Sequence, residues 1–258
     1  MRASPDQNLA ALKANLDALG LHPGMDLAVH SRLLSFGRIP GGVETVYQAL
    51  RDAVDPGGTL IFPTYTLPLT SEALYDAATT PSHGMGALSE YARQRPDAVR
   101  TDCPMHGHCA IGPKAPGLLN CDPLLSLGPG ASFDWMLAEG FHLLLLGCTA
   151  QEGATYMHHV EAMVGVPYRS WIDVPRRILR SGTVTDVQCR YYGRARNSRV
   201  KNDLSRAEAA LKDHPDCVVA PIDASRDSLR APLAAVDETV RELLRQDPYA
   251  LTRQEATP

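Results

Sequence analysis

The 258-residue sequence has no apolar run that approaches the ~18 to 20 residues of a membrane-spanning helix. Its longest apolar run, residues 141–147, has the length of a buried strand. The first residues contain no apolar stretch of the kind that forms a secretory signal. These absences predict a protein that neither spans a membrane nor is exported.

An excess of positive charge is also missing, because 25 Lys and Arg stand against 29 Asp and Glu. Nucleic-acid binding by phosphate neutralisation is therefore not expected. The six cysteines, at positions 103, 109, 121, 148, 189 and 217, follow no disulfide-framework spacing. In the absence of a secretory signal, we expect them to be reduced thiols of a cytoplasmic protein.

Strand and helix patterns alternate through the first 62 residues. Apolar residues at helical spacing come first, a short apolar stretch follows Gly24, and a second helical pattern after Gly42 leads to another apolar stretch. This βαβ order favours a parallel sheet with helices on its faces. After residue 170 the pattern changes to period two around Ser181 and Gly182, which predicts an antiparallel hairpin.

The sequence therefore predicts a single α/β domain over residues 1–258, with a mostly parallel sheet flanked by helices and an antiparallel β insertion in the C-terminal half. Residues 63–84 are expected to form a long loop over a site. The expected helices cover residues 9–19, 43–54, 85–95, 131–140, 203–212 and 226–245, with another beginning near residue 154. The expected strands cover residues 25–30, 59–62, 141–147, 171–179, 183–192 and 217–222.

Two groups of residues in the first half are candidates for ligand binding. His30, Ser31 and Arg32 end the first expected strand, and ligands bind beyond such strand ends in open α/β sheets. Gly41 and Gly42 precede a helix, whose free N–H groups and positive end attract anions such as phosphate. A plain tight turn is the alternative for the glycine pair.

Two cysteines and two histidines fall within seven residues: Cys103, His106, His108 and Cys109. Zinc binding is one interpretation. The spacing does not match that of structural zinc sites, which usually pair two separate clusters of ligands. A loop histidine that binds a ligand or moves a proton is a second interpretation, and a purely structural role is a third.

His158 and Glu161 follow the most apolar expected strand and share one helix face, because they stand three residues apart. A carboxylate within reach of a histidine orients a general base and stabilises its imidazolium. The alternatives are a surface pair or a metal motif, although the second histidine that zinc proteases place at the fourth position is missing.

Five segments, taken in order, resemble the aminoglycoside N(3)-acetyltransferase family, which is distinct from the GNAT fold. They are residues 29–33 (VHSRL) with Gly41, Gly42 and Thr45; residues 52–64; residues 85–90 (MGALSE) with Arg100 and residues 103–107; residues 127–133 (LGPGASF); and residues 155–161 (TYMHHVE). The resemblance covers about residues 5–165.

The resemblance implies an acyl-CoA-dependent N-acyltransferase that uses acetyl-CoA or another acyl-CoA, acts on a small-molecule amine and needs no metal. His158, oriented by Glu161, would remove a proton as the amine attacks the thioester directly. His106 would line the same site, and either this residue or backbone N–H groups near Ser31 would stabilise the oxyanion. The residues implied to hold coenzyme A are His30, Ser31, Arg32, Gly41, Gly42 and Thr64.

Three alternatives stay open at this point. The acyl donor could be carried on an acyl carrier protein in secondary metabolism, or the acyl group could pass through Cys103 or Cys109. The same scaffold could also serve as a non-catalytic or zinc-dependent binding protein. In every case neither nucleic acid nor a membrane is an expected partner.

Eight arginines gather in the predicted hairpin and its flanks: Arg169, Arg176, Arg177, Arg180, Arg190, Arg194, Arg196 and Arg199. A solvated strand face explains them without any function. Alternatively, part of this excess faces the active site, which would favour an acceptor amine on an acidic molecule over a polycation.

Overall fold

The computed structural model describes residues 4–195 and 199–254. Its main sheet is formed by β1 (Leu27–Ser31), β2 (Leu60–Pro63), β4 (Val99–Arg100), β5 (His108–Ile111), β6 (His142–Leu146), β10 (Val218–Pro221) and β11 (Asp227–Pro232). The strand order is β10-β11-β6-β1-β2-β5-β4. The strands β6, β1 and β2 pair in parallel, and β10 and β4 run in the same direction, whereas β11 and β5 run opposite. The mostly parallel sheet is thus confirmed.

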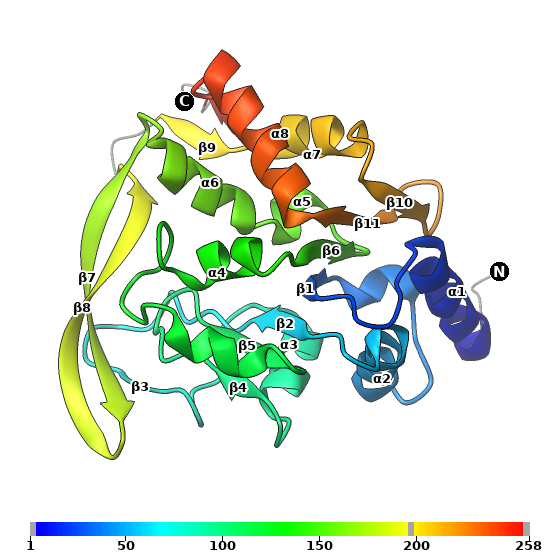
Figure 1. Cartoon of the computed structure of the whole chain (residues 1–258), viewed down its shortest axis with the longest axis horizontal. Helices are drawn as coiled ribbons and strands as arrows, with labels where there is room; N and C mark the ends of the chain where they lie inside the picture. Colours follow the sequence, from blue (N-terminus) through cyan, green and yellow to red (C-terminus); the bar gives the residue numbers. More distant parts are fainter. Residues whose placement is uncertain (1–3, 196–198, 255–258) are drawn as a thin grey trace.

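Helices cover both faces of this sheet (Figure 1). One face packs against α1 (Pro5–Ala18), α2 (Val43–Val54) and α3 (Gly86–Arg93). The other packs against α4 (Ser132–Ala138), α5 (Ala150–Gly153), α6 (Tyr156–Val164), α7 (Ser205–Lys212) and α8 (Leu233–Gln246). Among the helices of the described ranges, none is both long and apolar enough to cross a membrane.

Side chains along β1 point alternately to the two faces of the sheet. Leu27 and Val29 pack with the α1–α3 side, whereas Ala28 packs with the α4–α8 side. His30 therefore points to the same side as Ala28. There it meets α5 at Gly153, where an added Cβ would lie 2.7 Å from the His30 Cβ. A glycine at position 153 allows this close approach.

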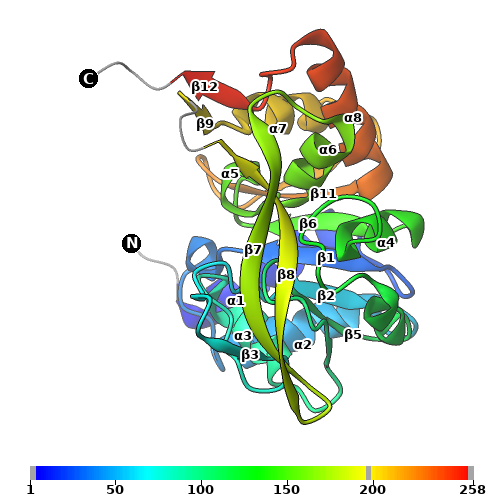
Figure 2. The same cartoon turned by 90° about the vertical axis from the view of Figure 1, so that its left-hand side faces the viewer.

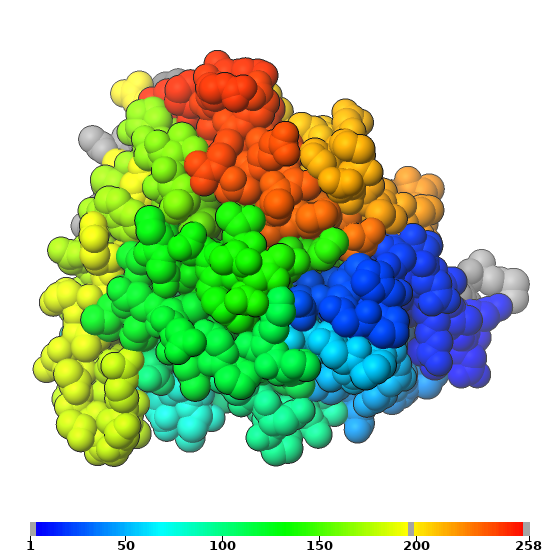
Figure 3. Space-filling view, viewed as in Figure 1, coloured from blue at the N-terminus to red at the C-terminus, as the bar shows by residue number. Residues whose placement is uncertain are grey.

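The predicted antiparallel insertion is present as β7 (Arg169–Arg180) and β8 (Thr183–Arg194), with Arg180 paired to Thr183. Ser181 and Gly182 both have positive φ, at 49° and 76°, as a two-residue hairpin turn with right-handed strand twist requires. β3 (Leu74–Asp76) pairs in parallel with β7. The hairpin runs along one side of the molecule, past both helical layers, and forms a ridge at its edge (Figures 2 and 3).

Three sequence-based predictions differ from the structure, and the first is the expected loop over residues 63–84, which contains β3. The expected helix over 226–245 is wrong in its first part, because residues 227–232 form β11 and the helix starts only after Pro232. His108, expected in a loop, begins β5, whose four residues are all buried and therefore show no alternation. A short antiparallel pair, β9 (Val200–Asn202) and β12 (Thr252–Gln254), was not predicted.

Candidate active site

A histidine and a glutamate contact each other on α6, beyond the carboxyl end of β6. His158 Nδ1 lies 2.5 Å from Glu161 Oε2. Helical geometry brings the two together, because residues three apart share a face. The Glu161 side chain is 0% exposed, whereas that of His158 is 19% exposed. The pair predicted from the sequence is thus present, with the carboxylate inside the protein and the imidazole partly open to solvent.

Two more side chains hold Glu161. The Tyr168 hydroxyl donates a hydrogen bond to Oε1, and Arg169 Nε lies 2.8 Å from Oε2 as an ion pair. Burial alone would raise the pKa of Glu161. The hydrogen bond from His158 and the charges of His158 and Arg169 outweigh burial, so the pKa lies below its ordinary value. The ionised carboxylate therefore accepts a hydrogen bond from a protonated Nδ1.

Asn202, the last residue of β9, completes a ring around the imidazole. Its Nδ2 donates to His158 Nε2 at 3.2 Å, and its Oδ1 accepts from Arg169 Nη2 at 2.9 Å. His158, Glu161, Arg169 and Asn202 thus contact one another in a closed cycle. Because Nδ1 carries the proton, Nε2 presents a lone pair, which is the tautomer that a general base needs.

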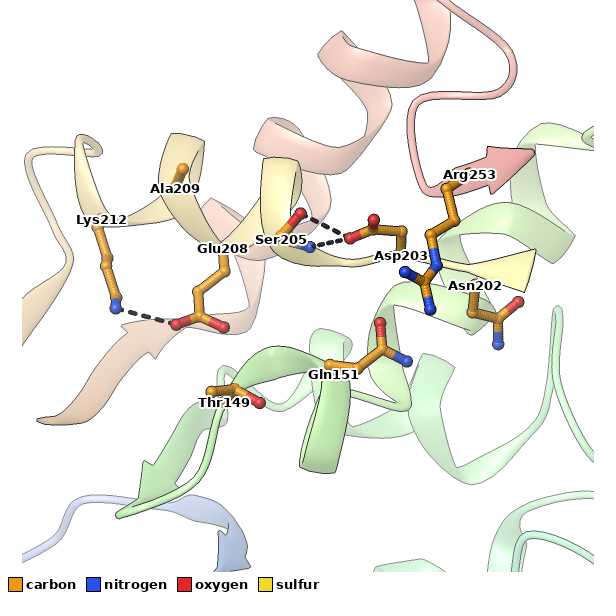
Figure 4. A pocket seen from close by; sticks show the side chains of 9 residues that line it. All are labelled: Thr149, Gln151, Asn202, Asp203, Ser205, Glu208, Ala209, Lys212 and Arg253. Atoms are coloured by element: carbon orange, nitrogen blue, oxygen red, sulfur yellow. Dashed lines mark hydrogen bonds and ion pairs between the residues drawn. The ribbon is translucent and has the colours of Figure 1, made fainter. Parts of the chain in front are cut away.

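The ring adjoins a cavity of ≈ 590 Å³, which Asn202 helps to line (Figure 4). The other lining residues are Thr149, Gln151, Asp203, Ser205, Glu208, Ala209, Lys212 and Arg253. A neighbouring cavity of ≈ 310 Å³ shares Thr149, Gln151, Glu208 and Lys212 and continues to Arg226. The space next to the candidate base is therefore large enough for a small ligand.

His106 is a buried neutral imidazole in the same region. Its Nδ1 contacts the Ser126 hydroxyl, and its ring meets the Tyr65 ring edge-on at 4.7 Å between centroids. Burial, together with the charges of His158 and Arg169, lowers the pKa of His106 to about 3. The structure thus brings His106 within electrostatic reach of His158.

His30 and His108 lie at the same edge of the sheet, where β1 ends and β5 begins. Burial lowers the pKa of His30 to about 4. Burial also lowers the pKa of His108 well below its ordinary value, together with the charges of His30 and His106. His108 Nδ1 lies 2.8 Å from Ser132 Oγ. Both rings are neutral parts of the interior beneath the site.

Gly41 and Gly42 form the turn that starts α2, with φ of +71° and +63°. An added Cβ on Gly41 would lie 2.3 Å from Thr45 Oγ1, so the tight turn needs glycine for structural reasons alone. The two glycines also line a cavity of ≈ 450 Å³ together with Arg38. The rest of its lining is apolar: Leu33, Gly37, Ile39, Pro40, Val43, Val46 and Ala87.

The other residues implied to hold coenzyme A have different surroundings. Ser31 ends β1, and the exposed Arg32 forms an ion pair with Glu152 at 2.6 Å. Thr64 is fully buried, and Arg100 donates to both its hydroxyl (3.1 Å) and its carbonyl (3.0 Å). The hydroxyl of Thr64 therefore already has a partner within the protein.

The four residues with a possible zinc interpretation do not converge. His106 and His108 face Ser126 and Ser132, Cys103 packs with Met105 and Cys189, and Cys109 lies in the core beneath α3. Burial raises the pKa of Cys103 and of Cys109 to about 12, so neither thiol is ionised at neutral pH. Across residues 4–195 and 199–254, no three His, Cys, Asp or Glu side chains gather as metal ligands.

Most hairpin arginines have partners within the protein. Arg169 binds Glu161, Arg176 donates to the Leu67 carbonyl, Arg177 and Arg180 pair with Asp186 and Asp102, Arg190 lies over the Trp171 ring, and Arg194 donates to the Val200 carbonyl. Arg199 is exposed, and Arg196 lies outside the described residues. Among the arginines of this group that the structure describes, Arg169 is the one that contacts the candidate base.

The sequence did not indicate Asn202 or Arg253 as site residues. Asn202 lies 44 positions after His158 in the chain, and Arg253 enters the cavity only because β12 pairs with β9. A lone Asn and a lone Arg carry no local motif. Only the tertiary fold brings them to the site.

Known proteins are similar to this chain in sequence and in fold. Residues 28–225 match the family model described as aminoglycoside 3-N-acetyltransferase. The chain is 34% identical over 190 residues to aminoglycoside N(3)-acetyltransferase VII of Streptomyces paromomycinus, covering 66% of each chain. It is 32% identical over 180 residues to aminoglycoside N(3)-acetyltransferase III of Salmonella sp, covering 63% of each chain. The matched region therefore spans slightly less than two thirds of these relatives.

Solved structures extend the similarity over nearly the whole chain. A mutant of aminoglycoside acetyltransferase AAC(3)-IVa in complex with gentamicin has a TM-score of 0.78 and 25% identity, covering 97% of this chain and 92% of that one. The binary complex of AAC-IIIb with CoASH has a TM-score of 0.77 and 20% identity, covering 97% and 98%. The second likeness concerns the fold alone.

Proposed function

The chain belongs to the aminoglycoside 3-N-acetyltransferase family, and from that premise we propose that it transfers the acetyl group of acetyl-CoA to an amine of a small polar molecule, with His158 as general base. The observation that carries the proposal is the closed ring of contacts around His158, next to a ligand-sized cavity. The related AAC-IIIb structure with CoASH supports coenzyme A as the carrier of the acyl group.

The reaction needs one group that first accepts a proton and then returns it. The amine nitrogen attacks the thioester carbonyl carbon while His158 Nε2 takes a proton from the amine. The C–S bond then breaks, and the proton passes to the departing thiolate, so that the products are an amide and free coenzyme A. Glu161 keeps Nδ1 protonated throughout and stabilises the transient imidazolium.

Two further features of the structure suit the acyl donor and the oxyanion that forms during the reaction. The cavity at Gly41, Gly42 and Arg38 suits a phosphate of the donor. Backbone N–H groups near Ser31, or the buried His106, would stabilise the oxyanion. With its pKa near 3, His106 would act there as a neutral hydrogen-bond donor and not as an acid.

Acetyl-CoA turnover tests the proposal directly. Purified protein is incubated with acetyl-CoA and a panel of amines, and free thiol is measured. We expect His158→Ala to lower kcat by roughly 10²- to 10⁴-fold, the usual contribution of a general base, and to leave coenzyme A affinity unchanged by calorimetry. Near-normal turnover in this variant would contradict the assignment of His158 as the base. A wild-type protein that is inactive with every amine would contradict the proposed activity.

A further inference from the structure

The cavity beside His158 has a balanced set of charges. Its lining contains two carboxylates, Asp203 and Glu208, and two cations, Lys212 and Arg253. Electrostatic complementarity between a site and its ligand favours a ligand whose charges balance in the same way. A polycation would require an excess of carboxylates, which this lining does not have.

Both carboxylates are already engaged within the protein. Asp203 Oδ1 accepts from the Ser205 hydroxyl at 2.6 Å and from its backbone N–H at 3.1 Å. Glu208 accepts from the Ala150 N–H at 2.7 Å and pairs with Lys212 at 2.9 Å. Lys212 therefore neutralises Glu208, whereas Asp203 keeps its charge next to Arg253.

The two cations differ in their availability. Lys212 lies 2.9 Å from Glu208 and 2.9 Å from Asp227, so two carboxylates neutralise it. Arg253 extends from β12 into the cavity, between Asp203 and Asn202 and above Gln151 (Figure 4). Within the described part of the chain, its guanidinium forms no hydrogen bond or ion pair. The hydrogen bonds from Ser205 lower the pKa of Asp203, and the charge of Arg253 adds to this effect.

Gln151 adds a hydrogen-bond donor beside Arg253. Its Oε1 accepts the Leu204 N–H at 3.0 Å, so its amide NH₂ group is left to donate into the cavity. A planar guanidinium next to an amide donor is suited to a carboxylate or a phosphate, which accept several hydrogen bonds at once.

We infer that the acceptor of this enzyme is a monoamine that also carries one anionic group, a carboxylate or a phosphate. The anion binds Arg253 and Gln151, and the amine reaches Asn202 on the same cavity wall, whose side-chain amide contacts His158 Nε2. The inference rests on the proposed acetyl transfer and deepens it, because it names the class of acceptor. The preference for an acidic acceptor is here assigned to Arg253 and not to the hairpin arginines, because most of those side chains already have partners within the protein.

Matched probes test the inference. They are 3-aminopropyl phosphate, 3-aminopropanol and 1,3-diaminopropane, which differ only in the charge at the far end, together with gentamicin as a polycation. Binding is measured by calorimetry in the presence of coenzyme A, and kcat/KM with acetyl-CoA. We expect the phosphate to be favoured over the alcohol at least about tenfold, as a charge-assisted hydrogen bond provides.

Charge reversal identifies the responsible residue. Arg253→Glu is expected to remove the preference for the phosphate and to favour the diamine. The matched control is Arg206→Glu, which reverses an exposed arginine on α7 that pairs with Asp247 and does not line the cavity. This control is expected to keep the wild-type preference.

The outcomes separate this inference from the proposed function. Turnover of gentamicin or the diamine in preference to the phosphate would overturn the acidic-acceptor inference and leave acetyl transfer standing. Equal binding of phosphate and alcohol, or an unchanged preference in Arg253→Glu, would overturn it as well. Release of no coenzyme A with any probe, while the phosphate binds Arg253 as expected, would instead count against acetyl transfer.

Discussion

Asn202 occupies the position that a substrate amine must approach, because its Nδ2 is the hydrogen-bond partner of His158 Nε2. The amide donor occupies the lone pair of Nε2 without adding charge, so an incoming amine takes the place of this hydrogen bond. The charged groups that already face the imidazole are Glu161 from α6 and Arg169 from β7, and His106 nearby is neutral. We therefore predict that Asn202 acts through His158 as a positioning residue.

Asn202→Asp tests that role, because it replaces a neutral donor by a carboxylate of the same shape. A carboxylate beside Nε2 favours the doubly protonated imidazolium, which cannot act as a base. We expect the acidic limb of the kcat/KM profile to move to higher pH by about one unit or more, with activity recovering in alkaline buffer. Asn202→Ala is the matched control, since it removes the amide without adding charge. An acidic limb at the same pH in the wild type and in Asn202→Asp would contradict the assignment of Asn202 as a positioning residue.

At the level of single residues, the sequence predicted one half of the site. His158 and Glu161 are detectable because a helix converts a spacing of three into a contact. Their partners Arg169 and Asn202 come from strands that follow later in the chain, and no periodicity relates a strand residue to a side chain on another element. The sequence did identify Arg169 as part of a basic hairpin, but its burial against Glu161 depends on tertiary packing.

At the level of elements, strong periodicity was reliable and short buried strands were not. The β1–α2–β2 unit and the β7–β8 hairpin were predicted because each repeats a clear pattern over several turns or pairs. The expected helix over 226–245 began too early, since Leu229 and Ala231 alternate inward on β11 and Pro232 marks where a helix can start. Pro232 was the feature in the sequence that separates the two elements.

The start of α2 carries the prediction on coenzyme A. A Cβ added at Gly42 would meet open space, but the φ of +63° means that any side chain there strains the backbone. Gly42→Glu and Gly42→Gln share this strain and nearly the same volume, and they differ in charge. If helix N–H groups at this position face a phosphate, Gly42→Glu should bind coenzyme A more weakly than Gly42→Gln, by about tenfold for one added repulsive charge. Equal affinities in calorimetry would place the phosphates elsewhere.

On the scale of the whole molecule, burial of neutral histidines links stability to pH. Burial lowers the pKa of His30 to about 4 and of His106 to about 3. It also lowers the pKa of His159 to about 4, and the Nδ1 atom of His159 accepts the Gly128 N–H at 3.1 Å. The unfolded chain has ordinary histidines with a pKa near 6.5. Between about pH 6.5 and pH 4 the unfolded state therefore binds protons that the folded state excludes.

Because the folded-state pKa values are depressed, the stabilisation from these three histidines is complete above pH 6.5 and is lost as the pH falls towards 4. Each contributes a slope of about 1.4 kcal/mol per pH unit, so together they reach about 4 kcal/mol per unit, a large part of a typical folding free energy of roughly 5–15 kcal/mol. Urea denaturation at pH 7.5, 6.5 and 5.5 measures this slope above the range where carboxylates titrate. His159→Asn keeps an acceptor for the Gly128 N–H and should lower the total slope by about one quarter, because the buried His108 is a fourth such group and one of four is removed. A urea midpoint that stays constant from pH 7.5 to 5.5 would mean that these histidines already take up protons in the folded protein.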